Sequence, residues 1–231
     1  MQEAGTNNWG GHIMWGDDSS GNGHYTAIQS YIWIPPESSF SGPTGSEASF
    51  WIGMGGTGPG FLGDTPTVPF WQAGVDVILP NTVQLWYEGF QSSSDFEKQQ
   101  HVTSSVTFGR VVELQLEFTS GGLGYVCFTI VDWQDCLYDS LLSGDYNANT
   151  AEWVVEAPLN AQNEETILPD FGPVNFTKMV LAPNAGQFSQ QALETCYGGA
   201  SCEDSGQTVT PPPFYTGDFS RGFNVAYSGS T

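Results

Sequence analysis

Basic residues are scarce in this chain of 231 residues. Lys and Arg together number 4 against 25 Asp and Glu, which gives a formal net charge of −21 at pH 7. Nothing basic is clustered enough to hold a nucleic-acid backbone or an anionic membrane, so we expect neither as a partner. Asp and Glu side chains titrate at about pH 4, so in acid most of the repulsion between the negative charges of the chain would be lost. A high content of Asp and Glu that serves only solubility would give the same composition, but the scarcity of Lys and Arg favours an acidic working environment.

Other absences narrow the function further. The chain has no apolar run of membrane-spanning length, and its first residues contain no signal-peptide hydrophobic region, so any signal or pro-segment of a secreted form is absent from it. The histidines, His12, His24 and His101, are scattered without metal-ligand spacing, and we expect no metal and no cofactor. Gly-x-Ser-x-Gly and His-Glu-x-x-His are both missing.

The four cysteines form two pairs that are close in sequence. Four cysteines allow three pairings, and the spacing favours the local ones, Cys127 with Cys136 and Cys196 with Cys202. Two disulfides would suit an oxidising compartment and a secreted, extracellular protein. Four reduced thiols remain the alternative.

Strand patterns dominate the chain, and no helical period of any length competes with them. Short segments rich in β-branched and aromatic residues lie between Gly, Pro, Asn and Ser. The expected strands are 24–34, 48–54, 70–78, 82–90, 104–118, 125–133, 151–157 and 173–181, while Ala192–Gly198 could form a helical turn. This spacing predicts an all-β antiparallel sandwich of two packed sheets in a single domain, residues 1–231. Nothing demands more than a monomer.

A two-residue period sorts the side chains of four expected strands onto two faces. One face of each strand is apolar, which assigns it to the core: Phe50, Ile52, Met54, Trp71, Ala73, Val75, Val77, Val83, Leu85, Tyr87, Trp153 and Val155. The opposite face carries carboxylate, amide and indole groups beside glycine: Trp51, Gly53, Gln72, Gly74, Asp76, Gln84, Trp86, Glu88, Glu152, Val154 and Glu156. Side by side, the second set would make an acidic groove with aromatic walls.

For any one of these strands, an ordinary solvated face is the better interpretation. Trp51 and Trp86 argue against it, because large aromatic side chains are seldom exposed without a ligand or a partner. We therefore expect these two tryptophans to line a binding surface.

Six short blocks, in order along the chain, together resemble the glutamic peptidases, also called eqolisins. They are NWGG (Asn8–Gly11), WIG (Trp51–Gly53), QAGVD (Gln72–Asp76), WYEGF (Trp86–Phe90), AEWVVE (Ala151–Glu156) and FGPVNF (Phe171–Phe176). The resemblance implies a lectin-like (concanavalin-type) sandwich and a secreted endopeptidase that cleaves polypeptides in acid. By motif, its catalytic pair is Gln72 and Glu156.

An amide and a carboxylate can divide the work of peptide hydrolysis. Glu156 would take a proton from water and later protonate the leaving nitrogen, while the Gln72 NH2 group would stabilise the oxyanion. An amide suits that task in acid because it does not titrate. Neither a covalent intermediate nor a metal is needed.

Six further residues would complete the site that the resemblance implies. Asp76 and Glu88 would fix the orientation of Gln72 and the water. Trp9, Trp51 and Trp86 would line the cleft and hold substrate side chains. Glu152 shares a face with Glu156, although it could equally be a solvated or structural carboxylate.

The chain departs from the family pattern after the WIG block. The family usually continues with an apolar residue, Asp and Gly, whereas Met54, Gly55 and Gly56 stand here. An acidic residue expected in the cleft is therefore missing, which affects substrate preference and pH optimum more than the reaction.

Two other functions stay open at this point. A lectin-like carbohydrate-binding module or glycosidase would also have a groove with tryptophans and paired carboxylates, and an inactive structural sandwich would need no site. Gln72 argues against a glycosidase, because that reaction needs two carboxyl groups, one on each side of the scissile glycosidic bond.

Asn175-Phe176-Thr177 is a formal glycosylation sequon, but within an expected strand we attribute it to chance.

Overall fold

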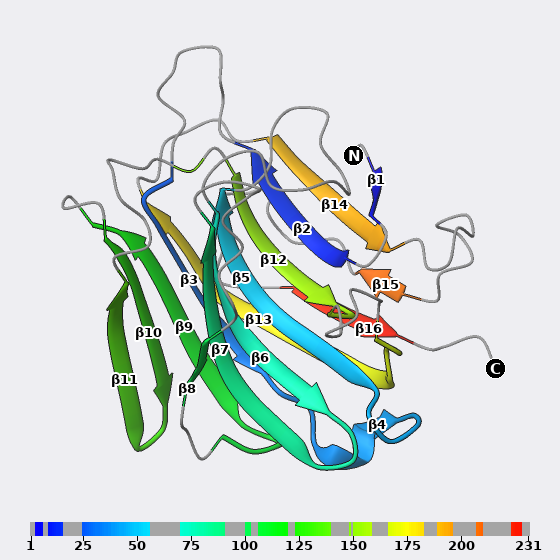
Figure 1. Ribbon diagram of the computed structural model, residues 1–231. Helices are drawn as coiled ribbons and strands as arrows, with labels where there is room; N and C mark the ends of the chain where they lie inside the picture. Colours follow the sequence, from blue (N-terminus) through cyan, green and yellow to red (C-terminus); the bar gives the residue numbers. More distant parts are fainter. Residues whose placement is uncertain are drawn as a thin grey trace.

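Strands make up almost all of the regular structure in the computed structural model (Figure 1). The structure describes residues 3–6, 9–15, 25–55, 70–90, 100–102, 106–119, 123–139, 148, 150–158, 166–182, 189–195, 207–209 and 223–227. Within these ranges the one helical element is a single 3-10 turn, η1 (Glu37–Ser39). The prediction of an all-β protein is confirmed.

The strands form two curled sheets that pack face to face (Figure 1). The first sheet has the order β1 (Glu3–Thr6), β14 (Ser189–Thr195), β2 (Trp9–Trp15), β12 (Thr150–Glu156), β5 (Glu47–Gly55), β6 (Phe70–Ile78), β7 (Thr82–Phe90) and β8 (Gln100–Val102). The second has the order β11 (Trp133–Asp139), β10 (Gly124–Ile130), β9 (Val111–Phe118), β3 (Ala27–Trp33), β13 (Asp170–Ala182), β16 (Phe223–Tyr227) and β15 (Gln207–Val209), with β4 (Phe40–Ser41) beside β13. Of the described pairings, only β1 with β14 is parallel.

The core lies between the two sheets and contains the side chains that the two-residue period assigned to it. From the first sheet it includes Phe50, Ile52 and Met54 of β5, with Trp71, Ala73, Val75 and Val77 of β6. Leu85, Trp153 and Val155 are buried there too, and Val83 and Tyr87 pack against the cluster. Burying an apolar side chain of this size contributes roughly 1.5–3 kcal/mol, so the alternation of these strands specifies which face of the sheet is turned inward.

One expected strand begins late and one expected helical turn is wrong. The strand expected at 104–118 begins only at Val111, after a turn at Phe108 and Gly109. Residues 192–195 belong to β14, a strand that pairs with β2 on one side and β1 on the other, and not to a helical turn. The local sequence is polar and only weakly β-forming, so the strand conformation depends on its two partner strands rather than on intrinsic propensity.

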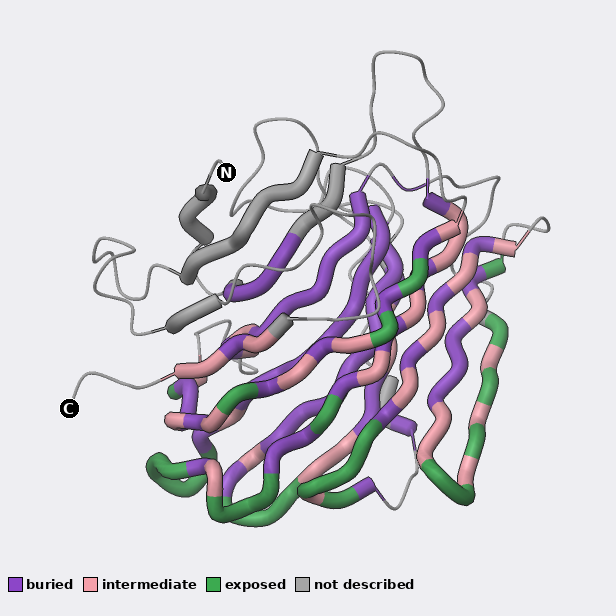
Figure 2. The backbone as a smooth tube through the Cα atoms, turned by 180° about the vertical axis from the view of Figure 1, so that it is seen from behind, coloured by how far each residue is buried: buried purple, intermediate pink, exposed green. Residues whose placement is uncertain are grey.

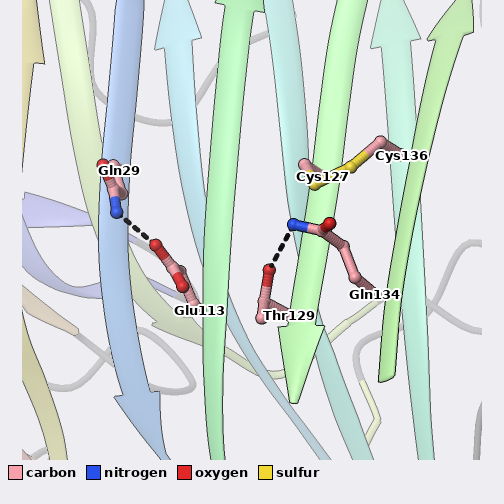
Figure 3. The surroundings of a disulfide bond; sticks show 6 residues. All are labelled: Gln29, Glu113, Cys127, Thr129, Gln134 and Cys136. Atoms are coloured by element: carbon pink, nitrogen blue, oxygen red, sulfur yellow. Dashed lines mark hydrogen bonds between the residues drawn. A yellow bond between two sulfur atoms is a disulfide. The ribbon is translucent and has the colours of Figure 1, made fainter. Parts of the chain in front are cut away.

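The disulfide between Cys127 and Cys136 confirms one of the predicted pairings. The two residues face each other directly across the β10–β11 hairpin (Figure 3). Thr129 and Gln134, the next outward-facing pair, are joined by a hydrogen bond from Gln134 Nε2 to Thr129 Oγ1 of 3.1 Å. Because β11 pairs only with β10 among the described strands, the disulfide fastens an edge strand to its neighbour. The pair Cys196 and Cys202 lies outside the described residues.

Candidate active site

Four neighbouring strands of the first sheet, β12, β5, β6 and β7, carry seven of the eight candidate residues. The alternation of each strand places them on the face opposite the core, as the sequence predicts. We call this the site face; its outward positions are Glu152, Val154 and Glu156 of β12, Ser49, Trp51 and Gly53 of β5, Gln72, Gly74 and Asp76 of β6, and Gln84, Trp86 and Glu88 of β7. The registers of the four strands arrange these positions in three rows across the sheet.

The first row contains Glu152, Gly53, Gln72 and Glu88. Gln72 is 8% exposed and Glu152 is 0% exposed. Gln72 donates a hydrogen bond from Nε2 to Oε2 of Glu88, its direct cross-strand partner, with an N···O distance of 2.9 Å. Glu152 and Gln72 therefore lie on opposite sides of a glycine, and one N–H of the Gln72 amide is already engaged by Glu88.

Gly53 leaves room for two aromatic rings over this row. A Cβ at Gly53 would lie 2.8 Å from Cε2 of Phe70 and 2.8 Å from Cζ3 of Trp51. The two rings meet edge to face with centroids 5.8 Å apart. A glycine is needed at this position because any side chain would displace the rings.

The second row contains Val154, Trp51, Gly74 and Trp86. A Cβ at Gly74 would lie 2.6 Å from Cβ of Trp51 and 2.8 Å from Cζ2 of Trp86. The Cβ of Trp51 and the ring of Trp86 thus occupy the space over Gly74, while the Trp51 ring extends over Gly53. Trp51 is 0% and Trp86 3% exposed, so both are buried although they stand on the face opposite the core, and their lining of a substrate cleft stays a prediction. The missing side chains of Gly53 and Gly74 let the indoles fold down against the sheet.

The third row contains Glu156, Ser49, Asp76 and Gln84. The indole nitrogens of the second row bond to it. Nε1 of Trp51 donates to Oε2 of Glu156 at 2.8 Å, and Nε1 of Trp86 donates to Oγ of Ser49 at 3.1 Å. Nε2 of Gln84 lies 3.4 Å from Oδ2 of Asp76, a weak hydrogen bond. The tryptophans therefore fix the Glu156 carboxylate and the Ser49 hydroxyl as well as covering the glycine.

Burial raises the pKa values of two carboxyl groups on this face. The pKa of Glu88 rises to about 8, mainly through burial; the hydrogen bond from Gln72 lowers it, and the charges of Glu156 and Asp76 raise it. The pKa of Glu47, two residues before Ser49 on β5, rises to about 7 through burial and the charge of Asp76. In acid both groups are neutral, so the crowding of carboxylates on the site face costs little there.

No described cation neutralises the site face. The Lys and Arg residues within the described ranges are Arg110 and Lys178, and both are exposed. Arg110 directly precedes β9 and Lys178 lies on β13, so both are on the second sheet. The described residues also contain no group of three His, Cys, Asp or Glu side chains that could hold a metal ion. Protonation is therefore the means by which the described part of this face can lose negative charge.

Glu152 influences a residue that the sequence did not single out. Burial and then the charge of Glu152 raise the pKa of Tyr25, which is buried at the edge of the core. The main chain of Tyr25 pairs with Ala148, with N···O distances of 2.7 and 2.9 Å. This bridge joins the chain entering β12, the strand that carries Glu152, to the chain entering β3.

The sequence missed Ser49, Phe70, Glu47 and Tyr25 as neighbours of the site. Extending the two-residue period of β5 back from Trp51 would have found Ser49 and Glu47, and the period of β6 would have found Phe70. Tyr25 lies outside the paired strands of the site and has no such signal.

The main chain of Trp9 on β2 is in register with Glu156, which places it beside the third row. The carboxylate missing from the family pattern is replaced by Gly55, whose carbonyl oxygen accepts a 2.9 Å hydrogen bond from Oγ1 of Thr150.

The model of the Peptidase A4 family matches residues 7–209. The chain belongs to this family. The peptidase is therefore a glutamic endopeptidase whose substrates are proteins, which decides against the carbohydrate-binding module and the structural sandwich that the sequence left open. A comparison with curated protein sequences found no match.

Solved glutamic peptidases share the fold of the peptidase. A scytalido-glutamic peptidase bound to a transition state analog inhibitor has a TM-score of 0.71 and 18% identity, covering 96% of this chain and 98% of that one. SCP-B, an eqolisin in complex with the tripeptide Ala-Ile-His, has a TM-score of 0.68 and 18% identity, and the match again covers 96% of this chain and 98% of that one. Aspergilloglutamic peptidase from Aspergillus niger has a TM-score of 0.55 and 20% identity, covering 79% of this chain and 99% of that one. Within the described residues, no helix has the length and apolar character of a membrane span.

Proposed function

We propose that the peptidase is secreted, works in acid and hydrolyses peptide bonds by direct attack of water, using Gln72 and a glutamate of β12. The observation that carries this proposal is the arrangement of the site face, where Gln72 of β6 bonds to Glu88 and the charge of Glu156 of β12 acts on that same carboxyl group. The glutamate takes a proton from water, and the water oxygen attacks the carbonyl carbon. The protonated glutamate then gives its proton to the leaving nitrogen as the C–N bond breaks.

The Gln72 amide can stabilise the oxyanion without titrating. One of its N–H groups is directed at Glu88, which leaves the second to donate to the developing negative charge. A Glu88 with a pKa of about 8 is neutral in acid, so it accepts this bond through its carbonyl oxygen and adds no negative charge beside the oxyanion. Glu88 and Asp76 thus act as positioning groups in the proposal.

Two glutamates of β12 compete for the role of base. The motif resemblance implies Glu156, which is half-buried and lies within electrostatic range of Glu88. The register places Glu152 in the row of Gln72: two strand spacings separate its backbone from that of Gln72, or about 10 Å. Glu156 lies four residues further along β12, which lengthens the separation to about 16 Å.

Side-chain reach allows both glutamates. A glutamine and a glutamate side chain each extend about 5 Å from the Cα atom, and a bridging water adds two hydrogen bonds of about 2.8 Å, so a span of about 16 Å covers either separation. The rings of Phe70 and Trp51 lie over Gly53, the residue between Gln72 and Glu152. The charge of Glu156, by contrast, raises the pKa of Glu88, the hydrogen-bond partner of Gln72. We therefore assign the base to Glu156, with Glu152 as the competing assignment.

Acid activity and secretion rest on separate observations. The raised pKa values of Glu88 and Glu47 favour a site face that is neutral in acid, and the charge of −21 at pH 7 favours the same environment. The Cys127–Cys136 disulfide suits an oxidising compartment. In this proposal the peptidase acts as a monomer on polypeptides, without nucleic acid or membrane as a partner.

The proposal is tested by digestion of an unfolded protein in acid, at about pH 3.5, with the wild type and the variants Gln72→Ala, Glu152→Gln and Glu156→Gln. Loss of cleavage in Gln72→Ala and in one of the two glutamate variants is expected. Undiminished cleavage by Gln72→Ala would exclude the dyad.

A further inference from the structure

The sequon Asn175-Phe176-Thr177 lies on β13, in the second sheet, and the proposed peptidase mechanism does not use it. It is the single Asn-x-Ser/Thr sequence (x other than Pro) in the 231 residues. A sequon within a strand is expected by chance alone. The face that each of its residues occupies, however, leaves the acceptor accessible.

The acceptor and the hydroxyl residue of the sequon both point away from the core. Phe176 is completely buried between the sheets. Asn175 and Thr177 flank it and are both half-buried on the opposite side of the strand, because successive side chains of a strand alternate in direction. This outer face of the second sheet is turned away from the first sheet and from the site face, and half-buried and exposed residues alternate along its strands with buried ones (Figure 2).

An exposed tryptophan lies directly beside the acceptor. Asn175 is the cross-strand partner of Trp33 on β3, which is 38% exposed. Cross-strand partners have Cβ atoms about 4.5–5.5 Å apart, so a sugar ring attached to the Asn175 amide would lie over the indole. Val111, the partner of Trp33 on β9, is exposed as well. A glycan at Asn175 would thus cover an apolar patch that otherwise faces water.

The amide of Asn175 is available for attachment. Within the ranges that the structure describes, no hydrogen bond joins the Asn175 side chain to another residue. Attachment of a sugar to Nδ2 would therefore break no internal hydrogen bond. The strand stays paired, because β13 bonds to β3 and β16 through its main chain.

We propose that Asn175 is an N-glycosylation site of the secreted protein. The donor is an oligosaccharide linked through a diphosphate to a lipid carrier. A bond forms between Asn175 Nδ2 and C1 of the first sugar, the bond from C1 to the diphosphate oxygen breaks, the lipid diphosphate leaves, and the amide releases one proton. The site requires entry into a glycosylating compartment, as the proposed secretion supplies, but it requires no peptidase activity.

The test expresses the full chain behind a cleavable secretion signal in a eukaryotic cell, so that the natural route of export is not assumed. Intact mass and electrophoretic mobility are measured before and after treatment with peptide N-glycosidase, which leaves an aspartate at position 175. We expect the wild type to carry one glycan that the enzyme removes. Asn175→Gln and Thr177→Ala should lose it, whereas Thr177→Ser, which keeps the hydroxyl, should retain it; Asn81→Gln, in the exposed turn between β6 and β7, is the matched control and should stay glycosylated.

A second measurement tests the contact with Trp33. The glycosylated protein should unfold at a higher temperature than the enzymatically deglycosylated protein, and Trp33→Ala should keep the glycan but lose most of that difference. Secreted wild type without a glycan at Asn175 would overturn the proposal. So would retention of the glycosylated chain in the cell while Asn175→Gln is secreted, because the folded strand would then not accommodate the glycan. Peptidase activity in acid, measured on the same samples, reports separately on the proposed function.

Discussion

Replacing Glu88 by Gln should stabilise the peptidase at neutral pH and leave its stability in acid nearly unchanged. The pKa of Glu88 rises from 4.5 to about 8 on folding, mainly through burial. Because the folded-state pKa lies above the unfolded value, folding favours the protonated form. The stabilisation from this proton is complete below about 4.5 and is lost as the pH rises through about 8.

The size of the effect follows from the shift. A rise from 4.5 to about 8, at roughly 1.4 kcal/mol for each pH unit, corresponds to at most about 5 kcal/mol. Glu88 is half-buried and interacts with two other carboxylates, so we expect water to screen part of this and place the loss at about 3 kcal/mol. Glutamine is nearly isosteric and can still accept the Gln72 hydrogen bond through its carbonyl oxygen, but it does not titrate.

The assay is urea unfolding, followed by tryptophan fluorescence, at a series of pH values between acid and neutral. For the wild type, the free energy of unfolding should fall as the pH rises. For Glu88→Gln the free energy of unfolding should fall less. At the highest pH of the series, the urea concentration at its unfolding midpoint should therefore exceed that of the wild type by about 1 M. Glu37→Gln, on the exposed turn η1, is the control and should follow the wild type. A difference between Glu88→Gln and wild type that stays constant over the whole pH range would refute the reasoning.

Three further predictions concern the glycine, indole and disulfide contacts. Gly74→Ala places a Cβ within 2.7 Å of a main-chain oxygen of β5, and should lower the free energy of unfolding by about 2–3 kcal/mol, measured by urea unfolding in acid. Trp51→Phe removes the indole hydrogen bond to Glu156 and should destabilise by about 1.5 kcal/mol. That loss should largely vanish when Glu156→Ala is already present, as a double-mutant cycle would show. Replacing Cys127 and Cys136 together by Ala opens a short loop and should lower the free energy of unfolding by about 2.5 kcal/mol; no change in a calorimetric comparison would contradict the fastening role of this bond.

The sequence predicts the strands of the site well because their alternation is strong. Strands β6 and β7 occupy the expected residues, 70–78 and 82–90, and their inward residues lie in the core. Large apolar side chains at every second position leave one way to bury a strand in a sandwich. The weak pattern of β14 carries no such signal, and only its pairing with β1 and β2 reveals it as a strand.

The relative position of the catalytic candidates depends on register, which the sequence does not fix. Period-two sorting puts Glu152 and Glu156 on one face with Gln72, but it cannot tell which of them lies in the same row. That depends on the pairing of two strands with β5, in which Gly53 is opposite both Glu152 and Gln72. A motif read along one strand contains no information about a residue two strands away.

The burial of the two tryptophans also follows from contacts that the sequence does not display. Trp51 and Trp86 stand on the face opposite the core, where a period-two pattern suggests water. They are buried because Gly53 leaves room for the Trp51 ring and Gly74 for the Trp86 ring, and because Glu156 and Ser49 accept their N–H groups. The need for glycine at positions 53 and 74 is recognised only once the side chains packed over them are known.

The most direct test of the account compares cleavage of an unfolded protein in acid by the wild type, Gln72→Ala, Glu152→Gln and Glu156→Gln. Gln115→Ala and Glu117→Gln, on the outer face of the second sheet, are the controls for folding and handling. We predict that Gln72→Ala and Glu156→Gln each lose about a thousandfold in kcat, that Glu152→Gln keeps at least about a tenth, and that both controls match the wild type. Full activity in Gln72→Ala, or in both glutamate variants, would contradict the dyad, and loss of activity in Glu152→Gln alone would move the base from Glu156 to Glu152.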